Sequence, residues 1–174
     1  MHLTHATIAL FGPALIVATA LPAQDKASVP PEPGRVVTLP KQYRDWHLIS
    51  IAHEAGSLND IRAVLGNKVA ADAFRSGKRP FPNGAVIVRL AYRYVASERN
   101  DAVFGQRQSF VAGDPTNVQI SVKDSRQYAG TGGWGYGQFV NGAPDPGSPP
   151  VATCLACHHR LDAARDLVFT DYAP

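Results

Sequence analysis

The sequence predicts one folded domain of the α+β class. Residues 46–53 and 85–95 alternate their side chains as strands do, and residues 67–75 have the cap and spacing of a helix. The length of 174 residues suits one domain, and a hydrophobic share of 45% is enough for a core. Fifteen glycines and 14 prolines indicate many turns, while the hydrophobic share excludes a disordered or collagen-like chain.

Residues 1–23 are predicted to be an export signal. They contain no Lys, Arg, Asp or Glu, and the apolar run from Ala6 to Leu21 is short for a membrane span. Small residues at 18–20 and at Ala23 offer cleavage sites. We therefore expect a periplasmic or exported protein. Because this segment also lacks basic residues, the alternative is an uncleaved signal that anchors the protein in the membrane.

Residues 24–42 are predicted to be an extended, proline-rich leader, and residues 43–174 the folded domain. The first predicted strand, residues 46–53, carries apolar side chains on both faces. Residues 61–65 suit either a strand or a helix.

The predicted helix follows these segments. Asn67 is its expected N-cap, and Ala70 and Phe74 share one face four residues apart. Gly77 is expected to end the helix just after Arg75.

The strongest predicted strand, residues 85–95, follows a rigid turn at residues 80–84. Arg89 and Arg93 put guanidinium groups on one of its faces. The other face is apolar and consists of Val86, Val88, Leu90, Tyr92 and Tyr94.

Four shorter elements complete the pattern. We expect short strands at residues 108–111 and 118–122, a single helical turn at residues 124–129, and a loop with four prolines at residues 141–150.

Residues 131–139 alternate glycines with aromatic residues. In a strand this pattern places Trp134 and Tyr136 on one face and leaves the other bare of side chains. A flat group can then approach the backbone closely.

Charged residues are scattered along the chain. Seventeen Lys and Arg against 14 Asp and Glu give a net charge of +3, without a basic cluster. Nucleic acids and lipid headgroups are bound by clustered basic residues, so we expect neither as a partner.

The only two cysteines, Cys154 and Cys157, are followed directly by His158. This is the spacing of a c-type haem attachment site, where both thiols reach the vinyl groups from one helical turn and the histidine faces the iron. Three alternatives stay open. A dithiol oxidoreductase is expected in a βαβ context, a zinc site with His158 or His159 lacks an obvious fourth ligand, and a local disulfide leaves the histidine unexplained.

The second axial position of the iron can be argued by elimination. The only methionine is Met1, inside the predicted signal, which excludes His/Met ligation in the mature protein. His47 and His53 remain as distant candidates, although a histidine on a strand is more often a hydrogen-bonded structural residue. We expect an open iron site, which favours small-molecule binding or redox chemistry over simple electron carriage.

Several segments occur in a characteristic order, and together they resemble the cytochrome P-460 family. They are Tyr43–Trp46, Phe81–Val88, Val122–Ser125, Thr131–Gly135, Cys154–His158 and Asp166–Thr170. The resemblance runs from about Tyr43 to the C-terminus. It implies a mainly antiparallel β-sheet with a few short helices, and one haem c attached near the C-terminus through Cys154 and Cys157, with His158 as proximal ligand. It also implies an exported bacterial protein and a homodimer.

Members of this family oxidise hydroxylamine, and the related cytochromes c-prime beta bind nitric oxide or carbon monoxide. The hydroxylamine-oxidising members carry a lysine that is cross-linked to the haem, and the matching position here is Arg89. A guanidinium is a poor nucleophile, so no cross-link is expected. Arg89 is instead a candidate for binding a haem propionate or an iron-bound ligand, or else a surface arginine. Arg62 resembles an arginine of the family's pocket.

The family also uses a distal carboxylate shortly before the haem motif, and the nearest acid upstream of that motif here is Asp145. Phe81, Phe104 and Phe110 are candidates for the wall of a hydrophobic distal pocket, or are plain core residues.

Three functions follow as hypotheses. The first is redox chemistry on hydroxylamine or nitric oxide at an open haem site, with electrons passed to a partner cytochrome. The second is non-catalytic binding of nitric oxide or carbon monoxide. The third is electron transfer by a haem with two histidine ligands.

Overall fold

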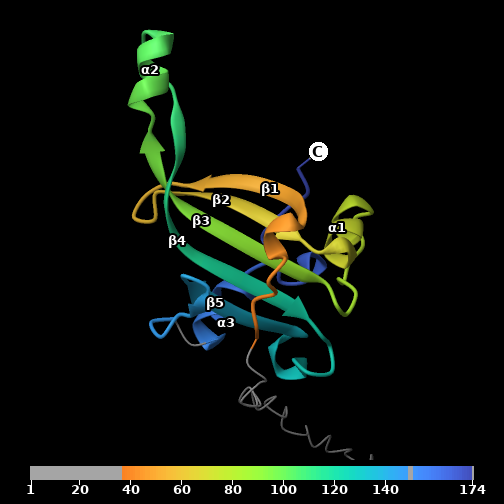
Figure 1. Cartoon of the computed structure of the whole chain (residues 1–174). Helices are drawn as coiled ribbons and strands as arrows, with labels where there is room; N and C mark the ends of the chain where they lie inside the picture. Colours follow the sequence, from red (N-terminus) through yellow and green to blue (C-terminus); the bar gives the residue numbers. More distant parts are fainter. Residues whose placement is uncertain (1–36, 149–150, 174) are drawn as a thin grey trace, which may run out of the picture.

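The computed structural model describes residues 37–148 and 151–173, which form a six-stranded antiparallel sheet with helices around it (Figure 1). The strands follow chain order across the sheet. They are β1 (His47–Glu54), β2 (Asp60–Gly66), β3 (Val86–Ala96), β4 (Phe110–Lys123), β5 (Trp134–Val140) and β6 (Ala143–Pro144). The described helices are α1 (Lys68–Arg75), α2 (Glu98–Phe104) and α3 (Val151–His158), with single 3-10 turns at Tyr43–Asp45, Ala129–Thr131 and Ala163–Arg165. The predicted α+β class is confirmed.

The predicted export signal at residues 1–23 lies outside the described residues, as does most of the predicted leader. Within the described part of the chain, no helix is long and apolar enough to cross a membrane.

The two faces of the sheet support separate hydrophobic clusters, as the alternation along β3 predicts. Ile87 belongs to a cluster with Phe74 of α1 and Trp134 of β5. Val88 and Leu90 belong to the other cluster, which the segment before β1 covers. Full burial of one such side chain contributes about 1.5–3 kcal/mol. Arg89 lies between Val88 and Leu90 in sequence, so it projects to the same face as Ile87.

The helix α1 begins and ends as the sequence predicts. The Asn67 side chain accepts a hydrogen bond from the Ala70 amide at 2.9 Å, which caps the helix. The same side chain accepts from the Val86 amide at 3.1 Å and donates to the Gly84 carbonyl at 2.8 Å. One residue therefore caps the helix and fixes it to the start of β3.

The first two strands settle one open question and correct one expectation. Residues 61–65 belong to a strand, β2. The prediction that β1 is apolar on both faces holds for the residues but not for their burial, since Leu48 and Ile51 are 52% and 60% exposed. These side chains are exposed because β1 is an edge strand of the sheet, and only Ile49 of its residues is buried.

The region between β3 and β5 corrects one prediction, confirms another and contains a helix that the sequence analysis did not predict. Residues 108–111 and 118–122 are not two short strands, because one long strand, β4, runs from Phe110 to Lys123. The helical turn predicted at residues 124–129 is confirmed, because the Tyr128 amide donates to the Asp124 carbonyl four residues back at 3.0 Å, and a 3-10 turn follows at Ala129–Thr131. The sequence reading also missed α2, which stands at the tip of a narrow arm that β3 and β4 extend beyond the sheet (Figure 1). Ser97 caps this helix and Gly105 ends it at a φ of 70°.

The glycines of β5 allow a flat group to approach the backbone closely, as the sequence predicts. That group is the side chain of Tyr128. Trp134 lies in the buried cluster and Tyr136 packs against that cluster, as expected for two side chains on one face. A Cβ atom at Gly135 would overlap the ring of Tyr128. The bare face of the strand is therefore filled by a phenol ring from the preceding turn.

Candidate functional site

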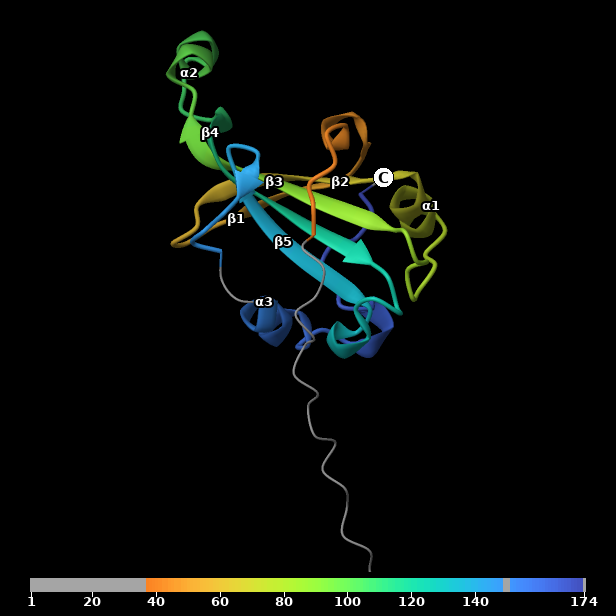
Figure 2. The same ribbon diagram turned by 60° about the horizontal axis from the view of Figure 1, so that its bottom comes forward.

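The helix α3 presents both cysteines and His158 towards the sheet. It lies beneath β5, and the His158 ring is 4.9 Å from the ring of Tyr136 between centroids (Figure 2). Phe169 contacts the other side of the imidazole edge-on, with centroids 5.0 Å apart. Because Cys154 and Cys157 are three residues apart in a helix, their thiols lie on the same side of it. The expectation that both thiols come from one turn of a helix is confirmed.

His158 has a defined tautomer. Its Nδ1 atom lies 2.5 Å from the carbonyl oxygen of Leu167, and a carbonyl can only accept. The proton is therefore on Nδ1, which leaves the lone pair of Nε2 free for a metal ion. This hydrogen bond also fixes the orientation of the ring, as partners of metal-binding histidines do.

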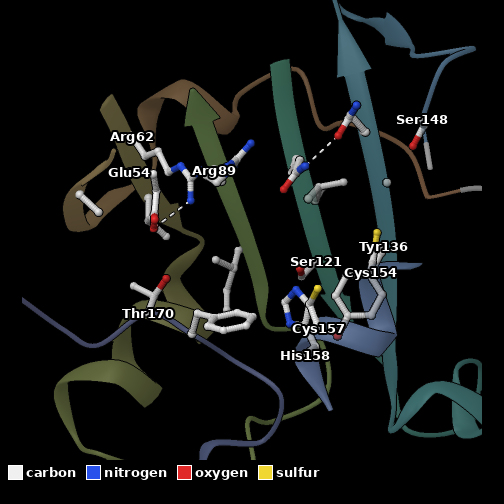
Figure 3. A pocket seen from close by; sticks show the side chains of 18 of the residues that line it. Glu54, Arg62, Arg89, Ser121, Tyr136, Ser148, Cys154, Cys157, His158 and Thr170 are labelled. Carbon is white, nitrogen blue, oxygen red and sulfur yellow. Dashed lines mark hydrogen bonds and ion pairs between the residues drawn. The ribbon is translucent and has the colours of Figure 1, made fainter. Parts of the chain in front are cut away.

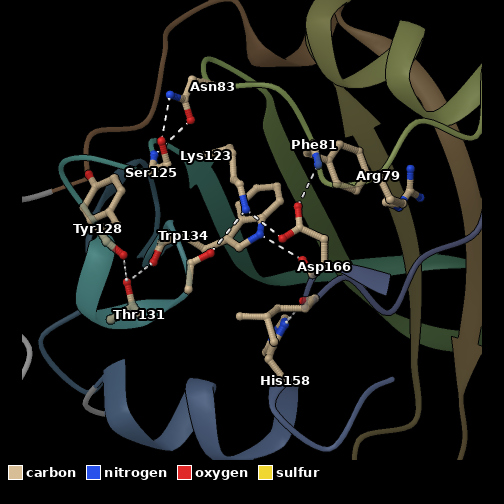
Figure 4. Close-up of polar contacts among 12 residues, drawn as sticks. Arg79, Phe81, Asn83, Lys123, Ser125, Tyr128, Thr131, Trp134, His158 and Asp166 are labelled. Carbon is tan, nitrogen blue, oxygen red and sulfur yellow. Dashed lines mark hydrogen bonds and ion pairs between the residues drawn. The ribbon is translucent and has the colours of Figure 1, made fainter. Parts of the chain in front are cut away.

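A strained turn holds the Leu167 carbonyl in place. Asp166 and Leu167 both adopt left-handed conformations, with φ values of 50° and 60°. Such conformations cost about 1–3 kcal/mol each and persist only where neighbouring contacts offset that cost. Here the Asp166 carbonyl accepts from the Trp134 indole at 2.9 Å, and its carboxylate accepts from the Phe81 amide at 2.7 Å (Figure 4).

Lys123 completes this support. Its Nζ lies 2.7 Å from Asp166 Oδ1 and 3.2 Å from the Gly132 carbonyl, and it stands 5.0 Å above the Trp134 ring. The exposed fractions of the Lys123 and Asp166 side chains are only 7% and 11%. We name the residues Phe81, Lys123, Trp134, Asp166 and Leu167 the anchor cluster.

The predicted site residues from the two halves of the chain line one cavity of about 620 Å³. Cys154, Cys157 and His158 stand at one end, and Arg62 and Arg89 at the other (Figure 3). The volume is within the range of cofactor and small-molecule sites, about 300–1,000 Å³.

Arg62 is paired with two carboxylates. Its Nε is 2.6 Å from Asp60 Oδ1, and its Nη1 is 3.1 Å from Glu54 Oε1. Glu54 is half-exposed and lines the cavity, although the sequence reading did not single it out. The antiparallel register pairs Glu54 with Asp60, which brings it beside the arginine two residues further along β2.

Two buried polar atoms of this cavity find no hydrogen-bond partner among the described residues. They are Arg89 Nε and the Tyr136 hydroxyl. Arg89 donates from Nη2 to the Asn117 side chain at 2.8 Å, and burial together with nearby Arg62 lowers the pKa of its guanidinium. Burial raises the pKa of Tyr136, which keeps the phenol protonated and a donor at neutral pH.

Several candidates from the sequence lie away from the cavity. Phe81 is buried in the core against Phe74 and Trp134, while Phe104 and Phe110 are exposed on the arm. None of the three lines the cavity: Phe81 is a plain core residue, as the alternative had it, and the arm carries Phe104 and Phe110 beyond the sheet. Asp145 does not line the cavity either. Its carboxylate accepts hydrogen bonds from the Gln138 side chain and from the Gly147 amide.

The two candidates for a second iron ligand are also outside the lining. His53 stacks on Tyr94 with centroids 3.9 Å apart and contacts Asn59, and His47 is exposed at the start of β1. Neither borders the cavity into which His158 faces.

The alternatives for the cysteine motif lose support. The described residues contain no group of three or more His, Cys, Asp and Glu side chains that could hold a metal ion. Both cysteines are free thiols. Burial raises the pKa of Cys154, whereas a thiol of a dithiol oxidoreductase needs a lowered pKa.

Comparison with known families decides between these readings, because the model of the Cytochrome P460 family matches residues 40–170. The chain belongs to the cytochrome P460 family. No curated protein matches the chain. Family membership implies haem, and the cavity fits this group. Two thiols and an oriented imidazole stand at one end of the cytochrome P460 site, and two donors without acceptors line its wall.

Proposed function

We propose that this protein is an exported c-type cytochrome with one haem, which carries out redox chemistry on a small nitrogen compound, hydroxylamine or nitric oxide. Cys154 and Cys157 would hold the haem covalently and His158 would be its axial ligand. When bound, the haem supplies a one-electron redox centre with a position for a small ligand.

The observation that carries the proposal is the geometry of His158. Its Nδ1 is occupied by the Leu167 carbonyl, and its Nε2 is left for iron. Among the residues described, those that line the cavity include no second imidazole and no thioether, which are the usual second ligands of electron-carrying haems. An open position favours substrate chemistry over electron carriage.

The chain's polar residues have the properties that oxidation of hydroxylamine requires. Conversion of hydroxylamine to nitric oxide releases three protons and three electrons. Glu54 is an ionisable carboxylate at the cavity and reaches solvent through its half-exposed side chain. It can therefore accept a proton inside and release it outside, while Arg62 holds its position. The electrons leave to an external acceptor, which we propose is another cytochrome.

Absorption spectra of the protein produced with periplasmic haem maturation test this proposal. We expect the ferric and dithionite-reduced forms to show a high-spin, five-coordinate haem c, and hydroxylamine to be oxidised with an artificial electron acceptor. Low-spin spectra in both states would favour electron transfer, and absence of haem absorbance would refute the proposal. Recovery of the chain in the periplasmic fraction tests export.

Non-catalytic gas binding is the second candidate, and Arg89 is the observation that favours it. Arg89 stands where the hydroxylamine-oxidising relatives are expected to have their cross-linked lysine, and it lines the cavity as a non-nucleophilic group. Reversible binding of carbon monoxide and nitric oxide without turnover of hydroxylamine above that of free haem would establish this candidate over the first.

A further inference from the structure

The two unpartnered polar atoms are both donors, and both belong to residues that line one cavity. Arg89 Nε and the Tyr136 hydroxyl are the buried side-chain atoms without a hydrogen-bond partner in the part of the chain that the structure describes. Most buried polar groups in proteins are paired, because an unpaired one costs about 1–3 kcal/mol. Two such donors around one cavity therefore indicate an occupant that supplies acceptors.

The charges around the cavity specify the kind of acceptor. Asp60 and Glu54 both pair with Arg62 at distances of 2.6 and 3.1 Å. Arg89 has no ion pair among the described residues, and its one hydrogen bond goes to the neutral amide oxygen of Asn117. Burial and the neighbouring Arg62 both disfavour its charge, as the lowered pKa reflects. Asp60 and Glu54 favour this charge through space but form no ion pair with Arg89, so an anionic occupant would supply the direct partner that Arg89 lacks among the described residues.

We propose that Arg89 binds an anionic oxygen ligand inside the cavity. This inference rests on the proposed function, because it concerns the same site. The ligand is either a small oxyanion of the size of nitrite or a propionate of the haem, and both present carboxylate-like oxygens to a guanidinium. Tyr136 is the second donor available to such an occupant.

The chain offers a matched control on the same strand. Arg93 lies on the same face of β3, four residues beyond Arg89, but it is exposed and does not border the cavity. The variants are Arg89→Gln, which keeps a hydrogen-bond donor without the charge, Arg89→Lys, which keeps the charge, and Arg93→Gln.

The first measurement is the melting temperature of the ferric protein as nitrite is added at constant ionic strength. If the ligand is an external oxyanion, nitrite raises the melting temperature of the wild type and of Arg93→Gln. Arg89→Gln then needs a nitrite concentration at least about tenfold higher for the same rise, because it has lost a charge-assisted hydrogen bond. Arg89→Lys recovers part of the affinity.

The second measurement identifies a propionate. In that case nitrite, which can still bind the open ferric iron, acts equally on all variants, and Arg89→Gln alone shifts the propionate bending band in the resonance Raman spectrum. If Arg89→Gln matches Arg93→Gln in both measurements, the proposal is overturned.

Haem absorbance separates these results from the proposed function. A chain without haem would refute the proposed function, and the nitrite titration would still show whether Arg89 binds an anion. A chain with haem but without an effect of Arg89 would refute only the anion site.

Discussion

Two cations on neighbouring strands, the buried Lys123 on β4 and the half-buried Arg89 on β3, have opposite surroundings. Lys123 has an ion pair with Asp166 at 2.7 Å, a carbonyl acceptor at Gly132 and an aromatic ring beneath it. Arg89 has one neutral acceptor, Asn117, and a buried Nε without a described partner. The first cation is neutralised within the chain, and the second is not.

The difference reflects the roles of the two regions: Lys123 belongs to the anchor cluster, and Arg89 lines the cavity. The anchor cluster fixes the Leu167 carbonyl, and through it the ring of His158, so a fully paired arrangement gives it one rigid geometry. The wall of the cavity must exchange contacts with a ligand, so it keeps donors that the chain itself does not use. The predictions below test this contrast, beginning with the largest expected effect.

Asp166→Ala is expected to cause the largest loss. It leaves Lys123 buried without a counter-ion and removes the acceptor of the Phe81 amide. Removal of one partner of a buried ion pair lowers the free energy of unfolding by about 3–5 kcal/mol. Chemical denaturation measures this change.

Asp171→Ala is the control for this substitution, because Asp171 pairs with Arg165 at the surface with a side chain 79% exposed. That change is expected to cost less than about 1 kcal/mol. Arg89→Gln, which loses contacts only to a neutral amide, should cost about 1 kcal/mol. Equal losses for Asp166→Ala and Asp171→Ala would remove the distinction between the two regions.

Glu54→Gln is expected to lower the turnover number for hydroxylamine by about tenfold or more, since a positioned general base contributes about 10²–10⁴-fold. The cavity keeps its shape because glutamine is nearly isosteric, so the affinity of the ferrous protein for carbon monoxide should change little. Steady-state kinetics with an artificial acceptor measure the effect. Glu98→Gln, in α2 at the tip of the arm, is the matched control. Turnover by Glu54→Gln at the wild-type rate would exclude Glu54 as the base.

Asp166→Asn is expected to raise the reduction potential of the haem. Loss of the negative charge disfavours the ferric form, and a less firmly held Leu167 carbonyl weakens the hydrogen bond from His158 Nδ1. A weaker bond makes the imidazole a poorer donor to iron, which acts in the same direction. Redox titration and the iron–histidine stretching frequency measure the two effects. A potential unchanged from that of Asp171→Asn would show that the anchor cluster does not act on His158.

The elements that the sequence predicted well are those whose signals are local. The Asn67 cap, the two-faced pattern of β3 and the Cys154–His158 spacing each depend on a few neighbouring residues. Strand β4 was divided in two because residues 112–117 contain Gly113 and Pro115, which indicate a turn. The strand accommodates them because its register with β3 shifts on either side of the pair Tyr92 and Pro115.

The site was predicted only as far as its residues lie within one motif or one strand face. Arg62 and Arg89 line the cavity as hypothesised, but their roles stay predictions. The ion pair between Lys123 and Asp166 joins residues 43 positions apart, and no periodic pattern in the sequence predicts such a contact. The position of Glu54 beside Arg62 likewise depends on the register between β1 and β2, which the sequence does not specify.

Tyr136→Phe is expected to have the smallest effect, and it tests the contrast at a single hydroxyl. The Tyr136 hydroxyl has no partner among the described residues, so its removal should change the free energy of unfolding by less than about 0.5 kcal/mol. The comparison is Thr131→Val, because the Thr131 hydroxyl lies within hydrogen-bonding distance of two carbonyl oxygens, that of Trp134 at 2.6 Å and that of Tyr128 at 3.0 Å. That substitution should cost about 1–2 kcal/mol in the same denaturation experiment. Equal costs would mean that the phenol does have an acceptor in the haem-loaded protein. Since the described residues supply none, that acceptor would belong to the occupant of the cavity, and Tyr136 would then be a residue of the binding site.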